Sequence, residues 1–254
     1  MSAALYGEAE QHNREIHENR KAWASKPVLR RVYAEFYRAI CDSMDLSMPG
    51  LKVELGSGMG NIRDHIPECL LTDLFPNSWL DRVENAYRLS FPDASVSHLV
   101  LFDVWHHLEH PANALAEFRR VLVPRGRVIL LEPAMSAVGR LIYGNCHHEP
   151  LGFEAPLSDC LADLDAPDAT RYFAAQSSAH RIFLRRELPG LLEGWEIRAI
   201  RPITSFAYFG SGGFRGRQLC PESLYSLVKL ADGILGLAPR LFAARLLICI
   251  SRKP

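Results

Sequence analysis

The fold class of this chain is decided by one stretch, E-L-G-S-G-M-G at residues 54–60. It follows a short apolar run, Leu51–Leu55, which the pattern predicts as a buried strand, and it precedes a short helical segment at residues 61–66. Glycines in such a turn let a ligand approach the backbone without meeting a Cβ atom. A strand, a glycine turn and a helix in this order place that ligand at the carboxyl edge of a parallel sheet.

Outward from this stretch, short apolar runs alternate with segments whose apolar residues recur at helical spacing. This alternation implies an α/β fold with a parallel sheet. We expect two helices over residues 9–45, with a break near Ser25-Lys26-Pro27, and further helices over 112–122 and 221–235. The runs predicted as strands are residues 51–55, 69–72, 97–102, 127–131, 195–200 and 246–250.

The 254 residues are expected to form a single domain in four parts. The alternation is broken only at residues 134–190, a segment with several prolines and clustered histidines, which we interpret as an irregular lid over the carboxyl edge of the sheet. The parts are an N-terminal helical cover (1–48), a ligand-binding core (49–133), the lid insertion (134–190), and C-terminal strands and a helix (191–254).

Composition excludes some classes of function. Lys plus Arg and Asp plus Glu both number 29, so the net charge gives no general attraction to nucleic acid or to an anionic membrane. The apolar segment at 224–250 is interrupted by charged residues, so no stable membrane insertion is expected. The six cysteines form no C-x-x-C pair, so we expect neither a zinc site nor disulfides, but reduced thiols in a cytoplasmic protein.

Two kinds of ligand compete for the glycine turn. A dinucleotide site has the pattern G-x-G-x-x-G, but Asn61 stands at the third glycine position, and Gly60 comes one residue early. This spacing suits a ligand without pyrophosphate. Asp73 lies 17 positions after Gly56, where an acid can accept hydrogen bonds from ribose hydroxyls. The alternatives are a plain strand–turn–helix connection and an aspartate that only caps a helix.

Several motifs in order resemble one family, the UbiE/type 11 group of class I S-adenosylmethionine-dependent small-molecule methyltransferases. They are residues 54–60, Asp73, 85–93, 102–111, 117–126 and 131–133. The resemblance covers residues 51–133 well and the flanks loosely. It implies a Rossmann-like, seven-stranded, mostly parallel sheet with helices on both faces, N-terminal helices over the acceptor site, and a lid insertion after the fifth strand. It also implies S-adenosyl-L-methionine as the cofactor.

The family's cofactor roles transfer to matching positions. Glu54 and the glycine loop would hold the methionine part, and Asp73 would bind the ribose. Asn85 stands where the family often has Asp, and its amide oxygen can equally accept a hydrogen bond from the adenine. The implied set is Glu54, Gly56, Ser57, Gly58, Gly60, Asp73, Leu74, Phe75, Asn85, Ala86, Phe102 and Asp103.

The sequence departs from the family pattern in three places. Ser97 replaces an aspartate near the start of the fourth strand, and Arg125 replaces the first glycine of a Pro-Gly-Gly turn. Neither position is expected to face the cofactor. The segment between Asp73 and Asn85 has room for barely one helical turn. We therefore expect an adenine pocket that is more open than usual.

Candidate catalytic residues follow the predicted strands at 97–102 and 127–131. Methyl transfer to a hydroxyl is helped by a general base, and histidine is the commonest choice near neutral pH. His106 and His107 follow the strand at 97–102, and Glu132 stands at the end of the strand at 127–131, so all three should reach the carboxyl edge. The alternative is structural: a histidine that caps a helix or packs in the core, and a glutamate that makes a supporting hydrogen bond.

Residues of the insertion and of the C-terminal part complete the expected site. Cys146, His147 and His148 could hold a metal, but adjacent side chains rarely converge on one ion, so no metal site is predicted. We assign His147, His148 and Tyr208 to the substrate, with Tyr208 in a glycine-containing loop over the mouth of the site. The apolar segment 224–242 is expected to pack on the sheet.

The predicted function is methyl transfer from S-adenosylmethionine to a small-molecule acceptor, with an oxygen nucleophile of a sugar, a polyketide or a lipid-linked precursor as the favoured acceptor. A carbon or nitrogen acceptor stays open. The alternatives are an NAD-dependent oxidoreductase and a cofactor-binding protein without turnover. No nucleic-acid partner is expected, and a homodimer is possible.

Overall fold

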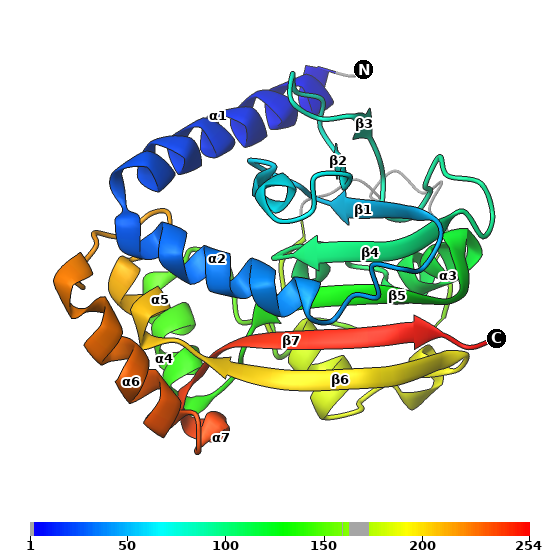
Figure 1. The fold of residues 1–254 in the computed structure, drawn as a ribbon. Helices are drawn as coiled ribbons and strands as arrows, with labels where there is room; N and C mark the ends of the chain where they lie inside the picture. Colours follow the sequence, from blue (N-terminus) through cyan, green and yellow to red (C-terminus); the bar gives the residue numbers. More distant parts are fainter. Residues whose placement is uncertain (1–2, 159, 163–172) are drawn as a thin grey trace.

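A computed structural model describes residues 3–158, 160–162 and 173–254. Its centre is one seven-stranded sheet in the order β3-β2-β1-β4-β5-β7-β6 (Figure 1). Strands β1 to β5 pair in parallel, whereas β7 is antiparallel to both β5 and β6. The predicted mostly parallel sheet is therefore confirmed. The strands are β1 (Leu51–Leu55), β2 (Leu70–Asp73), β3 (Arg82–Val83), β4 (Val96–Phe102), β5 (Leu122–Pro133), β6 (Trp195–Thr204) and β7 (Ala243–Arg252).

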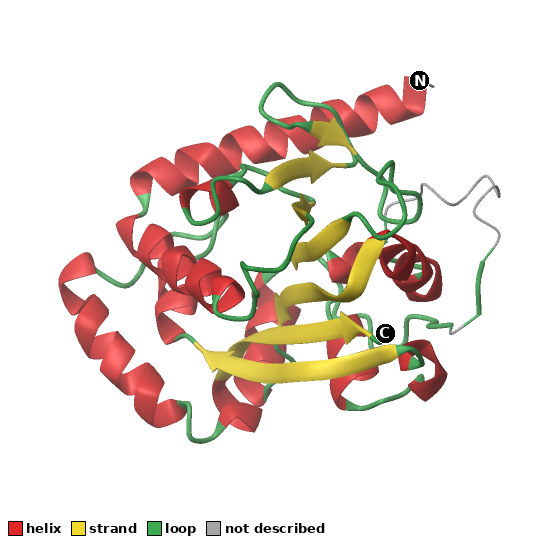
Figure 2. Cartoon of the chain, turned by 45° about the vertical axis from the view of Figure 1, so that its right-hand side comes forward, coloured by secondary structure: helices red, strands yellow, loops and turns green. Residues whose placement is uncertain are grey.

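Helices cover both faces of the sheet and its carboxyl edge (Figures 1 and 2). The expected break between the first two helices is confirmed, because proline fills the first turn of the second helix. The last four helices lie beyond the carboxyl ends of the parallel strands (Figure 1). The helices are α1 (Ala3–Ser25), α2 (Pro27–Cys41), α3 (Pro111–Val121), α4 (Ala137–Cys146), α5 (Phe206–Ser211), α6 (Tyr225–Leu235) and α7 (Pro239–Phe242).

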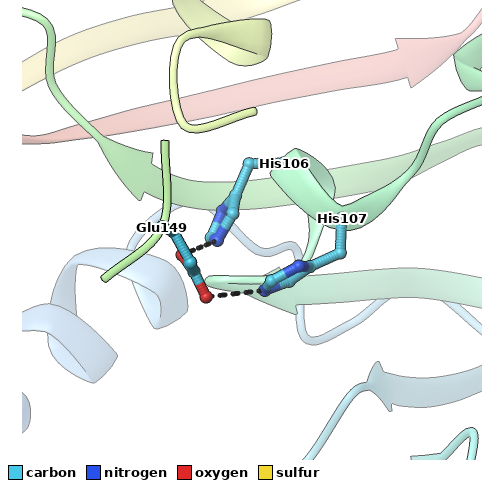
Figure 3. A group of neighbouring side chains, drawn as sticks. All are labelled: His106, His107 and Glu149. Atoms are coloured by element: carbon cyan, nitrogen blue, oxygen red, sulfur yellow. Dashed lines mark ion pairs between the residues drawn. The ribbon is translucent and has the colours of Figure 1, made fainter. Parts of the chain in front are cut away.

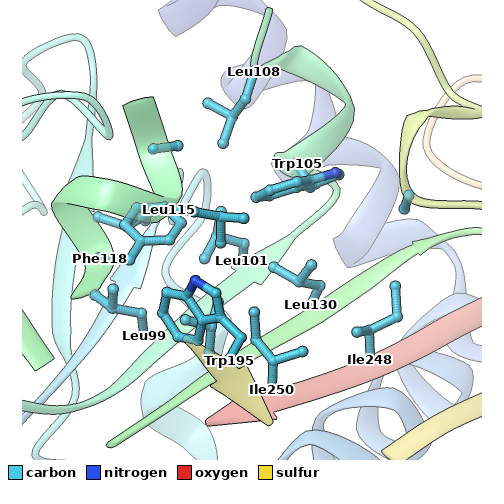
Figure 4. Close-up of a cluster of buried hydrophobic side chains, with 14 of the residues drawn as sticks. Leu99, Leu101, Trp105, Leu108, Leu115, Phe118, Leu130, Trp195, Ile248 and Ile250 are labelled. Carbon is cyan, nitrogen blue, oxygen red and sulfur yellow. The ribbon is translucent and has the colours of Figure 1, made fainter. Parts of the chain in front are cut away.

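The unbroken apolar run of β4 reflects burial on both faces of the sheet. Every residue of β4 is buried. Leu99 and Leu101 belong to the cluster on the face covered by α3, which Figure 4 shows. Val100 and Phe102 belong to the cluster on the opposite face, where α2 packs. A strand enclosed in this way has no polar side, which explains why its sequence shows no alternation.

The strand order argues against the oxidoreductase alternative. A dinucleotide-binding fold has the order 3-2-1-4-5-6, with a continuous run of parallel strands. In this chain the antiparallel strand β7 lies between β5 and β6 and pairs with both of them. The sheet therefore departs from the dinucleotide-binding strand order.

Three expectations are corrected by the structure. Tyr208 lies in the short helix α5 and not in a loop. The region 134–190, expected to be irregular, contains helix α4. The apolar side of α6 does not pack on the sheet, since Leu227, Leu230 and Ile234 are each more than 60% exposed. The seventh strand, β3, is two exposed residues long and has no apolar signal from which it could be predicted.

No helix in the described part of the chain is both long and apolar enough to cross a membrane.

Arg125 stands where the family resemblance implies glycine, and its φ of 65° is left-handed. We expect Arg125→Gly to stabilise the fold by about 0.5–1 kcal/mol, because it removes roughly 1–2 kcal/mol of steric strain but adds flexibility to the unfolded chain. Urea unfolding followed by circular dichroism measures this change. The matched control is Arg38→Gly in helix α2, which should destabilise by about 1 kcal/mol. A loss of stability in both variants would contradict the strain at Arg125.

Candidate active site

The glycine turn after β1 contains three left-handed glycines with different surroundings. Gly56, Gly58 and Gly60 have φ values of 68°, 50° and 80°. A Cβ atom at Gly56 would collide with the side chain of Val104, and one at Gly60 would lie 2.7 Å from Leu71. At Gly58 a Cβ atom would meet nothing within 4 Å. Gly56 and Gly60 are therefore required by packing, whereas Gly58 borders open space.

Glu54, at the end of β1, points a buried carboxyl group toward the same region. The residue is 2% exposed, and its Oε2 atom has no hydrogen-bond partner within the described residues. Burial raises the pKa of Glu54 to about 8. A buried oxygen without a partner carries a desolvation penalty that a ligand donor would remove. A ligand ammonium beside Glu54 meets this need, so the residues present fit the amino-acid end of S-adenosylmethionine.

This raised pKa predicts a pH dependence of stability. The unfolded chain releases the Glu54 proton near pH 4.5, and the folded chain keeps it until about pH 8, so this group lowers stability as pH rises between those values. The slope is about 1.4 kcal/mol per pH unit at most. Glu54→Gln should abolish this component. The measurement is the difference in unfolding free energy between wild type and variant from pH 5 to 8, which should grow with pH. A constant difference would contradict the raised pKa.

Two of the residues expected around the adenosine, Asp73 and Phe75, lie beside His12 of helix α1. The Asp73 carboxylate accepts a hydrogen bond from Gly58 N at 3.1 Å and lies 3.3 Å from His12 Nε2. The His12 ring also contacts Phe75, with 5.3 Å between ring centroids. Helix α1 therefore lies against Asp73 and Phe75 but leaves Leu74 47% exposed, and the open adenine pocket stays a prediction. Six of the expected cofactor residues do not line the main cavity: Gly60, Asp73, Leu74, Phe75, Asn85 and Ala86.

A cavity of about 1080 Å³ joins the glycine turn to the carboxyl ends of β4 and β5. Its near end is lined by Gly56, Ser57 and Gly58, and α1 and α2 contribute one wall. Its far end holds side chains from β4, from the insertion and from α5. The predicted residues that line it are Glu54, Gly56, Ser57, Gly58, Phe102, Asp103, His106, His107, His147, His148 and Tyr208.

His106 and Glu132 form a buried pair under the far end of the cavity. His106 Nδ1 lies 2.6 Å from Glu132 Oε2, while Glu132 Oε1 accepts hydrogen bonds from Val104 N and Trp105 N at 3.0 and 2.8 Å. Burial alone would lower the pKa of His106, but the nearby carboxylates outweigh it and raise the pKa to about 10. His106 is therefore protonated at neutral pH, and Glu132 orients it.

His107 presents its ring to the cavity. Its Nδ1 lies 2.9 Å from the backbone oxygen of Phe173, so Nδ1 carries the proton and Nε2 holds the lone pair. The side chain is 31% exposed. Burial, together with the adjacent charge of His106, lowers the pKa of His107. Of the two histidines, His107 is thus the one that can accept a proton at neutral pH.

Glu149 brings the histidines of β4 and of the insertion together. Its Oε2 lies 3.2 Å from His106 Nε2 and 3.6 Å from His147 Nδ1. Its Oε1 lies 3.6 Å from both His107 Nε2 and His148 Nε2. Burial would raise the pKa of Glu149, but the hydrogen bond from His106 and the charges around it lower the pKa well below its ordinary value. The group is therefore a carboxylate.

Asp103 makes contacts beyond its expected place beside the cofactor. It adopts a left-handed φ of 57° and forms a two-pronged ion pair with Arg245, a residue that is 2% exposed. Arg245 Nη2 also donates to the hydroxyl of Tyr208 at 2.8 Å. These contacts fix the Tyr208 hydroxyl at the cavity wall.

Some lining residues are not predicted from the sequence. Tyr33 and Tyr37 of α2, Gln176 and Arg245 all face the cavity. Glu149 follows the two histidines assigned to the substrate but has no predicted role of its own. An arginine within the apolar strand β7 is the one signal that could have identified Arg245, because buried charges are rare unless paired.

Comparison with known proteins finds one matching family and several solved structures of similar fold. Residues 53–130 match the model of a family described as a methyltransferase domain. A solved structure from Thermotoga maritima, described as an S-adenosylmethionine-dependent methyltransferase and possible histamine N-methyltransferase, is 13% identical, with a TM-score of 0.55 over 95% of this chain and 98% of that one. A geranyl diphosphate C-methyltransferase from Streptomyces coelicolor A3(2) is 13% identical, with a TM-score of 0.51 over 92% of this chain and 83% of that one. A search of curated protein sequences gave no match.

Proposed function

We propose that this chain, an S-adenosylmethionine-dependent methyltransferase of class I fold, transfers a methyl group to an oxygen atom of a small molecule bound beside His107 and Glu149. The observation that carries the proposal is that the glycine turn and a cluster of imidazoles with a carboxylate line the same cavity. Such proton acceptors are useful to a hydroxyl nucleophile, whose proton must leave.

The cofactor supplies a methyl group on a sulfonium, whose leaving group is a neutral thioether that needs no proton. Glu54 would bind the amino group of the cofactor, and Gly58 would leave room for its chain. Asp73 would bind the ribose after its contact with His12 opens. Leu74, Phe75, Asn85 and Ala86 would surround the adenine, as the resemblance implies, with Ser57 and Phe102 completing the pocket.

The chain's own residues then prepare the acceptor. The hydroxyl gives its proton to Nε2 of His107, and the acceptor oxygen is aligned by Tyr208, His147 and His148 at the cavity wall. His106, held by Glu132, keeps Glu149 in place. Alignment and exclusion of water are the main contributions of such a site. The cytoplasmic location and the homodimer stay predictions.

The test is product analysis. The protein is incubated with isotopically labelled S-adenosylmethionine and a panel of sugars, phenolic polyketides and lipid-linked hydroxyl compounds, and products are examined by mass spectrometry and NMR. Matched panels carry the same skeletons with amines, or with acidic carbon atoms and no hydroxyl. The proposal expects a methyl group on oxygen. A methyl group on carbon or nitrogen, or no turnover of any hydroxyl compound, would overturn it.

A further inference from the structure

The cluster around Glu149 has the donor set of a metal centre. His106 Nε2, His107 Nε2 and a Glu149 carboxylate oxygen lie within 4.8 Å of one another (Figure 3). Two ligands on one ion, at bond lengths of about 2.0–2.2 Å, are separated by roughly 3.3–3.5 Å in a tetrahedral site. His106 Nε2 lies 3.2 Å from Glu149 Oε2 and His107 Nε2 lies 3.6 Å from Glu149 Oε1, so each nitrogen is near that separation from one of the two carboxylate oxygens.

The outer contacts of both histidines match this interpretation. A metal-binding histidine usually donates its other ring N–H to a carboxylate or a backbone carbonyl, which fixes the ring and its tautomer. His106 Nδ1 faces the Glu132 carboxylate at 2.6 Å, and His107 Nδ1 faces the Phe173 carbonyl at 2.9 Å. Both imidazoles therefore direct Nε2 toward Glu149, and this orientation is set by partners outside the cluster.

The short helical turn at Trp105–His107 removes the objection that adjacent histidines cannot converge. The two rings lie 4.2 Å apart between centroids and are inclined by 42°. The second triad, His147, His148 and Glu149, is less suited. His147 Nδ1 already accepts hydrogen bonds from Gln176 Nε2 at 2.8 Å and from Glu149 N at 3.3 Å.

We propose that His106, His107 and Glu149 bind one divalent transition-metal ion of the Zn²⁺ class at the acceptor end of the cavity, and that the ion replaces the proton that His106 Nε2 carries in the metal-free protein, which is released to solvent. Two imidazoles and one carboxylate favour such a cation over Mg²⁺ or Ca²⁺, which prefer oxygen ligands. Two negative carboxylates, Glu132 and Glu149, supply compensating charge. Three protein ligands leave a coordination position open toward the cavity.

The role of the ion rests on the proposed function, but its binding does not. If the acceptor is a hydroxyl compound, a cation at this position would lower the pKa of that hydroxyl and hold its oxygen. His107 would then serve as a ligand in the loaded protein and as the proton acceptor in the metal-free protein. Binding of the ion can be measured with neither cofactor nor acceptor present.

The experiment is calorimetric titration of chelator-treated full-length protein with ZnCl2, together with the visible absorption of bound Co²⁺. We expect one ion per chain. His107→Ala and Glu149→Gln should weaken binding by more than about 100-fold, because loss of an outer partner alone costs about 10–100-fold. Glu132→Gln, which removes only an outer partner, should weaken metal binding by about 10–100-fold. The matched control, His148→Ala, should leave the affinity unchanged. Thermal unfolding verifies that each variant is folded.

Three results would overturn the site. One is the absence of stoichiometric binding to the wild-type protein. Another is binding that His148→Ala removes and His107→Ala retains, which would move the ion to the other triad. The third is a Co²⁺ spectrum of a six-coordinate hydrated ion. Stoichiometric binding without methylation of any hydroxyl compound would refute only the proposed function, and methylation without metal binding would refute only this site.

Discussion

His107→Ala is expected to lower the rate of methyl transfer by about 10²–10⁴-fold, while the affinity for S-adenosylhomocysteine stays nearly unchanged. The loss is large because Nε2 of His107 faces the cavity, and the Phe173 carbonyl holds the other ring nitrogen in place. The measurement is single-turnover kinetics with a hydroxyl acceptor from the panel, combined with calorimetric titration of S-adenosylhomocysteine.

Two controls give this result its meaning. His148→Ala removes an imidazole of the same cluster whose side chain is 45% exposed. It should lower the rate of methyl transfer much less than His107→Ala does. Glu132→Gln should give an intermediate loss, because it keeps the shape of the group that orients His106 but weakens its hydrogen bonds. Full turnover in His107→Ala would place the proton acceptor elsewhere in the cavity.

Gly58→Val should abolish binding of S-adenosylhomocysteine. The left-handed φ of 50° resists a branched residue, and the new side chain would project into open space beside the glycine turn. In the wild-type protein, ligand at 100 times its dissociation constant should stabilise the fold by about 2.7 kcal/mol. In the variant this stabilisation should vanish.

The readout is a thermal shift with and without ligand. Gly233→Ala is the control: its Cβ atom also meets nothing within 4 Å, but the residue lies in helix α6, away from the cavity. It should keep the full ligand-induced shift. Because Gly58→Val also adds backbone strain, the ligand-free melting temperature is compared first. A variant that is folded and still binds with normal affinity would show that the ligand does not lie against Gly58.

Local sequence predicted the parts of the fold that depend on neighbours in the chain. The run Leu51–Leu55 is bounded by a glycine turn, and the observed strand has the same bounds. The break at Pro27 likewise follows from backbone chemistry. The two-residue strand β3, by contrast, forms through its pairing with β2, and its two exposed residues carry no hydrophobic pattern from which a strand could be predicted.

The candidate site was less predictable for a physical reason. His106 and His107 could be assigned to the carboxyl edge because they follow a buried strand. The contact with Glu149 joins residues more than 40 positions apart, and no periodicity reports it. The pKa of His106 depends on burial together with that contact and with Glu132, so the sequence could not show which histidine stays neutral.

The two halves of the histidine cluster are anchored with unequal strength. His106 follows β4, whose residues are all buried, whereas the segment carrying Glu149 is connected to His106 through residues 175–177, with Ser177 N donating to Leu151 O and Ala175 N donating to His106 O. In native-state hydrogen exchange, the amides of β4 should therefore exchange only through global unfolding, and those of Ala175 and Ser177 through local opening at lower free energy. The protein should consequently lose activity at denaturant concentrations that leave the sheet intact.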